Sequence, residues 1–149
     1  MSISLSSSSI NIIKNSAQLI TSNDIEITTK MYKILFEKYP NVRSLFRDAP
    51  EDQYMRLAEI LSAYAVNIEK IERLKPALMV IAKKHVLVGI QIAHYPMIGM
   101  VLMMAIEDVL KEQATVEFMD AWREAYQMIA SILIEMEKEL YKNEEIKVL

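Results

Sequence analysis

The chain has 149 residues, of which 52% are hydrophobic, with only two glycines, four prolines and no cysteine. This length suits one domain with a substantial core, and the scarcity of glycine and proline favours long helices over turn-rich β structure. The formal net charge of −3 argues against a nucleic-acid partner, and the lack of cysteine excludes disulfides, thiolate zinc sites and iron–sulfur clusters.

Residues 1–8 are rich in serine and are expected to be disordered. They lack the basic region and the apolar run of a secretory signal. The most apolar stretch, residues 96–106, is about half as long as the ~20 residues that a membrane-spanning helix needs. The sequence therefore predicts a cytoplasmic protein without a membrane span. Its single domain would cover residues 9–142, and a charged tail would occupy residues 143–149.

The first half of the chain predicts four helical segments. A helix over residues 9–22 would be capped by Ser8 or Ser9, and a second over residues 25–38 by Asp24. The expected core stripe of the second helix is Ile25, Thr28, Thr29, Tyr32, Leu35, Phe36 and Tyr39. Pro40 opens a short helical turn that ends near Phe46. A longer helix follows over residues 51–71, with an inward face of Gln53, Leu57, Ile60, Leu61, Tyr64, Ile68 and Ile71.

Three more helices are predicted in the second half. The first covers residues 74–88 and stops at Gly89, with Leu78, Ile81, Ala82 and His85 on its core stripe. The next covers residues 93–112, with Tyr95, Ile98, Gly99, Leu102, Ile106 and Val109 inward. The last covers residues 115–142, with Phe118, Trp122, Tyr126, Ile129, Leu133, Glu137 and Leu140 along one side. No segment alternates with a period of two for long enough to predict a strand, so the expected fold is all-α, with six main helices and a short one.

Five polar side chains fall on stripes that are otherwise apolar: Tyr32, Gln53, His85, Tyr95 and Glu137. A buried imidazole needs a partner for each ring nitrogen, and a lone histidine in a core is more often a hydrogen-bonded structural residue than a ligand. Gln53 also suits the exposed first turn of its helix, and Glu137 suits the fraying end of the last one. The coincidence of all five favours a shared functional site.

Four motifs carry a resemblance to a known family: ITTKMYKILFEKYPNVRSLF, EDQYMRLAEILSAYAVNIE, IAKKHVLVGIQIAHYPMIG and DAWREAYQMIASILIEMEKELY. In this order and combination they resemble the bacterial single-domain haemoglobins and the globin domain of flavohaemoglobins. The resemblance implies a globin fold, a sandwich of helices around a pocket for haem b. It also implies that His85 is the proximal ligand of the haem iron and that Lys84 is the lysine preceding that ligand.

The other polar residues on apolar stripes, and two apolar residues, also match positions of this family. Phe46 matches the phenylalanine that packs on the porphyrin, and Leu57 an apolar wall of the pocket. Tyr32 and Gln53 match the distal pair that faces the gas ligand. Tyr95 and Glu137 match the proximal pair that hydrogen-bonds the second nitrogen of the histidine.

The resemblance implies a protein that binds O₂, NO or CO, and nitric oxide dioxygenation to nitrate is the favoured activity. The alternatives are storage or delivery of O₂, and gas sensing without turnover. Flavohaemoglobins continue into flavin- and nicotinamide-binding domains. Two isolated glycines cannot form the phosphate-binding turn of such domains, so electrons would have to come from an external reductase. The sequence leaves open whether the protein is a monomer or a homodimer.

Overall fold

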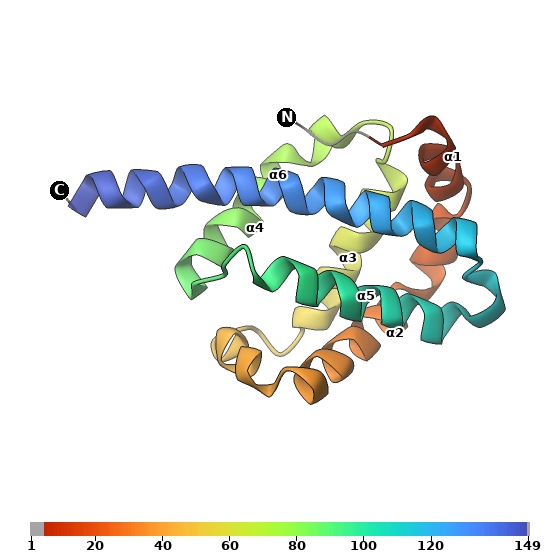
Figure 1. Ribbon diagram of the computed structural model, residues 1–149, viewed down its shortest axis with the longest axis horizontal. Helices are drawn as coiled ribbons and strands as arrows, with labels where there is room; N and C mark the ends of the chain where they lie inside the picture. The colour runs from red at the N-terminus through yellow and green to blue at the C-terminus, as the bar shows by residue number, and fades with distance from the viewer. Residues whose placement is uncertain (1–4, 149) are drawn as a thin grey trace.

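The computed structural model describes residues 5–148, and the side chains of residues 5–143 within them. Six α-helices account for most of this part of the chain, and no strand occurs in it. The helices are α1 (Ser7–Asn15), α2 (Ala17–Lys38), α3 (Gln53–Val66), α4 (Lys75–Val88), α5 (His94–Leu110) and α6 (Val116–Val148) (Figure 1). Three 3₁₀ helices connect them: η1 (Pro40–Phe46), η2 (Ile71–Leu74) and η3 (Lys111–Gln113). The all-α prediction is confirmed.

The break between the first two helices is at Ser16, and the prediction of a break before Asp24 was wrong. The polar run at residues 21–24 stays helical because its side chains bond within the fold. Thr21 donates to the carbonyl of Ala17 at 3.0 Å, and Asn23 donates to that of Leu19 at 2.8 Å. Such bonds let polar residues remain inside a helix that a sequence pattern would end.

This shift changes which residues of α2 face the core. The buried positions are Ile20, Ile27, Thr28, Met31 and Leu35, whereas Ile25 and Thr29, which were expected inside, are exposed. At the start of the chain the cap is neither Ser8 nor Ser9. The Oγ of Ser6 accepts from the backbone N–H of Ser9 at 3.1 Å, which satisfies one of the free donors of the first turn.

Two other boundaries differ from the expectation. Helix α3 ends at Val66 rather than near residue 71, and η2 carries the chain into α4. Helix α6 continues to Val148, six residues beyond the expected end. Part of the predicted Ser-rich terminus, residues 1–4, lies outside the described residues, as do the final residue and the side chains of the predicted tail from residue 144 onward.

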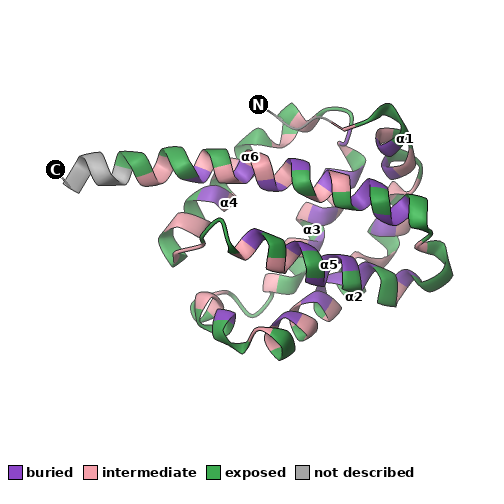
Figure 2. Cartoon of the chain, in the orientation of Figure 1, coloured by how far each residue is buried: buried purple, intermediate pink, exposed green. Residues whose placement is uncertain are grey.

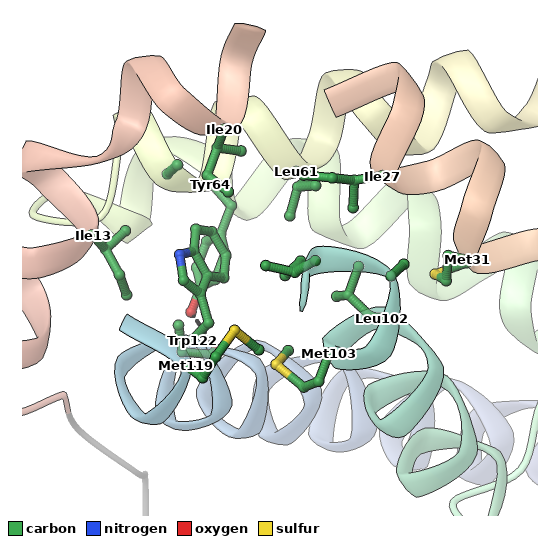
Figure 3. Close-up of a cluster of buried hydrophobic side chains, with 14 of the residues drawn as sticks. Ile13, Ile20, Ile27, Met31, Leu61, Tyr64, Leu102, Met103, Met119 and Trp122 are labelled. Atoms are coloured by element: carbon green, nitrogen blue, oxygen red, sulfur yellow. Dashed lines mark hydrogen bonds between the residues drawn. The ribbon is translucent and has the colours of Figure 1, made fainter. Parts of the chain in front are cut away.

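The helices pack in pairs that enclose a main core and a smaller cluster between α4, α5 and α6. Helix α2 lies against α3 and α5, while α6 lies against α1, α4 and α5. Each helix therefore shows a buried and an exposed side (Figure 2). Trp122 is the largest fully buried side chain. It stacks edge-on to Tyr64 at 6.4 Å between ring centroids, among residues from α1, α2, α3 and α5 (Figure 3).

No helix in residues 5–148 is long and apolar enough to span a bilayer.

Candidate functional site

His85 lies near the end of α4, and its ring has two different environments. Gly89 ends the helix with a left-handed φ of 86°, a conformation that costs glycine little because it has no Cβ. The His85 side chain is 30% exposed. Its Nδ1 contacts Glu137 Oε2 at 2.9 Å and the Tyr95 hydroxyl at 3.1 Å. Within the described residues, Nε2 has no hydrogen-bond partner.

Glu137 and Tyr95 complete this group from two other helices. Glu137 on α6 is 4% exposed, and Tyr95 at the start of α5 is 8% exposed. The Tyr95 hydroxyl donates to Glu137 Oε2 at 2.6 Å. Burial, followed by the hydrogen bond to the carboxylate and its charge, raises the pKa of Tyr95 strongly, so Tyr95 keeps its proton at neutral pH.

This arrangement assigns the tautomer of His85. A carboxylate only accepts hydrogen bonds, so the proton of a neutral imidazole lies on Nδ1, which faces Glu137. Nε2 then holds a free lone pair, which is the form in which histidine ligates a metal. Among the described residues, no group of three His, Cys, Asp or Glu side chains gathers in a metal-binding arrangement. The donor set is therefore one imidazole nitrogen with a carboxylate behind it, and it fits the single axial ligand of a haem iron.

A second group lies between α2, η1 and α3. Burial raises the pKa of Tyr32, and the nearby side chain of Gln53 opposes part of that rise. Tyr32 also meets Phe46 edge-on, with ring centroids 5.4 Å apart. Gln53 is the first residue of α3 and is half-buried, as is Leu57 one turn later. The distal candidates predicted from the sequence therefore come together, although they belong to three different elements.

Lys84 and His94 lie outside both groups. Lys84 is exposed on α4 and is not brought to either group. His94 lies at the start of α5, where its Nδ1 accepts the backbone N–H of Gln91 at 2.9 Å. His94 therefore has a local structural role in the turn between α4 and α5.

Sequence reasoning missed two tyrosines that support the His85 group. The Tyr126 hydroxyl donates to the backbone carbonyl of Tyr95 at 2.6 Å, and the Tyr141 hydroxyl donates to that of Ile90 at 2.8 Å. Both tyrosines share α6 with Glu137, so one helix holds the whole corner between α4 and α5. Their spacing of 11 and 4 residues around Glu137 places all three on one side of the helix, and this was the signal available in the sequence.

Gly99 lets Tyr126 approach α5. A Cβ atom at Gly99 would lie 2.6 Å from the Tyr126 ring, and this ring cannot retreat while its hydroxyl is bonded to Tyr95. Gly99→Ala should therefore lower the free energy of unfolding by about 1–3 kcal/mol, the usual cost of overpacking, as measured by urea denaturation.

A double variant provides the control for that prediction. Gly99→Ala should cost less in a Tyr126→Leu background than in the wild type, because the smaller side chain leaves room for the new methyl group. Equal costs of Gly99→Ala in the two backgrounds would mean that the contact with Tyr126 is not the cause.

A model of the globin family matches residues 29–133 of the chain. The chain belongs to the globin family. A globin-like protein of Aquifex aeolicus is 41% identical to this globin over 137 residues, which cover 92% of the chain and 97% of that protein. A flavohaemoprotein of Pseudomonas putida is 41% identical over 90% of the chain, but the chain spans only 35% of that protein. The resemblance to flavohaemoglobin globin domains is thus confirmed.

Solved structures agree with this assignment. An engineered carbene transferase made from a protein assigned as a nitric oxide dioxygenase of Rhodothermus marinus is 34% identical to this globin. It superposes with a TM-score of 0.90 over 93% of this chain and 97% of that one. A flavohaemoglobin of Malassezia yamatoensis with bound FAD and haem is 25% identical, with a TM-score of 0.81 over 93% of this chain and 38% of that one.

Proposed function

We propose that this globin binds haem b and that Nε2 of His85 would hold its iron. The supporting observation is the 2.9 Å contact between His85 Nδ1 and the buried Glu137 carboxylate, which orients the ring and leaves Nε2 available. Phe46 and Leu57 would contact the porphyrin and wall the pocket, and Lys84 would lie at its edge. When bound, haem supplies the redox iron at which O₂ and NO react.

The residues on the two sides have different tasks in this proposal. On the proximal side, the Glu137 carboxylate accepts a hydrogen bond from the Nδ1–H of His85. This bond increases the electron donation of the imidazole, as such carboxylates do for other ligating histidines. The Tyr95 hydroxyl fixes the carboxylate in this position. On the distal side, the Tyr32 hydroxyl and the Gln53 amide are donors for a diatomic ligand that acquires negative charge.

The activity that this arrangement supports best is nitric oxide dioxygenation. One NO, one O₂ and one electron give one nitrate, so each turnover needs a reductant, which we assign to a separate reductase protein. The buried carboxylate favours this activity over O₂ storage or delivery, because simple carriage does not need increased electron donation from the histidine. Gas sensing without turnover is the other alternative, and it would use the same residues.

Counting nitrate tests this proposal. The haem-loaded protein is supplied with O₂, NO and an excess of a small chemical reductant, so that no partner protein is needed. Many nitrates per haem are expected. One nitrate per haem, in the presence of reductant that restores the iron between additions, would contradict the dioxygenase and leave O₂ binding as the function.

The proximal carboxylate has a spectroscopic signature. Glu137→Gln should lower the Fe–His stretching frequency of the ferrous, ligand-free protein in resonance Raman spectra, because a neutral amide accepts the His85 proton less strongly. Glu139→Gln is the matched control, since Glu139 is exposed on the same helix and should leave the frequency unchanged. The same frequency in both variants and in the wild type would remove Glu137 from the proposed role.

A further inference from the structure

The outward side of α4 is apolar although it faces solvent. Val80, Leu87 and Val88 are 53%, 85% and 44% exposed, and Ala77 on the same side is exposed as well. Val80 and Leu87 recur at helical spacing opposite the stripe that carries His85, whereas Ala77 and Val88 lie nearer its edge. The solvent side of a helix in a globular protein is normally polar, so this surface has the composition of an interface. We call Val80, Lys83 and Leu87, with Lys84 and Val88 at their edge, the α4 surface.

Along the chain, the charges next to the α4 surface have one sign only. Lys83 and Lys84 lie within it and are exposed, without an ion-pair partner among the described residues. Residues 73–106 contain four cationic side chains and not one Asp or Glu. The whole chain has a formal net charge of −3, so the remainder of the sequence carries −7. The nearest carboxylates along the chain are Glu72 on η2 and Glu107 near the far end of α5.

This charge pattern decides which partner the surface fits. A second copy of the chain would bring like charges together, because an interface between two identical surfaces repeats the same lysines on both sides. A protein with an acidic face around an apolar centre would instead be attracted from a distance and would bury Leu87 and its neighbours on contact. Small, charge-steered interfaces of this kind are typical of transient electron-transfer complexes.

The position of the surface on α4 adds a second argument. His85 projects from the opposite side of the same helix, and a helix with its side chains is about 10–12 Å wide. A redox protein seated on the α4 surface would therefore lie about one helix width from the side chain proposed as iron ligand.

We propose that the α4 surface is the docking site for an acidic electron-transfer protein that delivers the electron for each turnover. This inference rests on the proposed function, because only a globin that is repeatedly reduced needs such a donor. The electron passes from the reduced partner to the ferric protein, so the partner is oxidised by one electron and no bond is formed or broken. Electrostatic attraction makes the reaction faster at low ionic strength.

Stopped-flow reduction of the ferric protein tests this docking. The probe is a reduced acidic [2Fe–2S] ferredoxin of the plant type, kept reduced by its own NADPH-dependent reductase. Lys83→Glu should slow the second-order reduction roughly five- to tenfold at low salt, and the difference should shrink at high salt. Lys14→Glu makes the same charge change at an exposed position on α1 and should have less than a twofold effect.

A second pair of variants tests the apolar centre. Leu87→Ser should weaken binding of the ferredoxin to the ferric protein at every salt concentration, as measured by isothermal titration calorimetry. The matched control is Val116→Ser, because Val116 is 77% exposed at the start of α6. Reduction by dithionite should be unchanged in all four variants, so a general defect of the protein would be recognised.

Three outcomes would overturn the docking site. These are equal reduction rates for Lys83→Glu and Lys14→Glu, reduction of the wild type by ferredoxin that does not depend on salt, and failure of ferredoxin to reduce it. Analytical ultracentrifugation tests the other occupant. If the wild type is a dimer and Leu87→Ser is a monomer, the α4 surface binds a second copy of the chain instead. The nitrate count with a small chemical reductant does not depend on any of these results, so failure of the docking site is distinguishable from failure of the dioxygenase.

Discussion

Replacement of His85 by alanine is expected to abolish stable haem retention. Among the described side chains, only His85 presents an available imidazole nitrogen beside a buried carboxylate, and its removal would leave Glu137 and Tyr95 without the ring that they orient. The purified variant should therefore lack the Soret band that the wild type is expected to show, or should lose haem to an acceptor protein within the time of the assay.

Two further measurements make this prediction specific. Added imidazole should restore haem binding to His85→Ala, because the small molecule can occupy the vacated space and ligate the iron. His94→Ala should retain haem like the wild type, because His94 contacts only the backbone of Gln91. Normal retention by His85→Ala, combined with loss in His94→Ala, would reverse the assignment of the ligand.

Tyr32→Phe is expected to release O₂ about 10–100 times faster than the wild type. A hydrogen bond to a group with charge contributes about 1.5–3 kcal/mol, and each 1.4 kcal/mol is a factor of about ten in the equilibrium. The substitution keeps the ring, and therefore the edge-on contact with Phe46, but removes the donor. Stopped-flow mixing with CO measures the release rate, and the autoxidation rate should rise in parallel.

The neighbouring residues provide the comparison for Tyr32. Gln53→Leu should have the same effect in a weaker form if Gln53 acts mainly by hydrogen-bonding Tyr32. Tyr54→Phe changes an exposed hydroxyl on α3 and should leave the release rate unaltered. A release rate for Tyr32→Phe within twofold of the wild type would transfer the role of main donor to Gln53.

The sequence predicted the helices better than their boundaries. Hydrophobic periodicity located α4, α5 and η1 within two residues, because Gly89 and Pro40 mark ends that the backbone geometry requires. It failed at residues 21–24, where Thr21 and Asn23 bond back to the preceding turn. A pattern of residue types does not distinguish a polar side chain that caps a helix from one that is satisfied inside it.

The residues of the candidate site could be predicted from the sequence, but the contacts between them could not. The polar residues stood out because each interrupts an apolar stripe, and the family resemblance gave each of them a role. The spacing of Tyr126 from Glu137 placed both on one side of α6, but its contact was not predictable, since it acts through the backbone carbonyl of Tyr95, 31 residues away in the sequence. A tyrosine on a core stripe is ordinary, so only the packed structure separates Tyr126 from the others.

The attachment of α1 to α6 has a consequence for synthesis of the protein in the cell. Ser9 on α1 donates to Glu124 on α6 at 2.7 Å, across a separation of 115 residues. A ribosome that adds about 5–20 residues per second needs roughly 6–23 s to cover that separation. During this interval the apolar side of α1, including Ile13, lacks α6, the helix that it contacts most, and a chaperone can bind it. His85 likewise lacks Glu137 until late in synthesis, so the orientation of its ring is completed only after this part of α6 has left the ribosome.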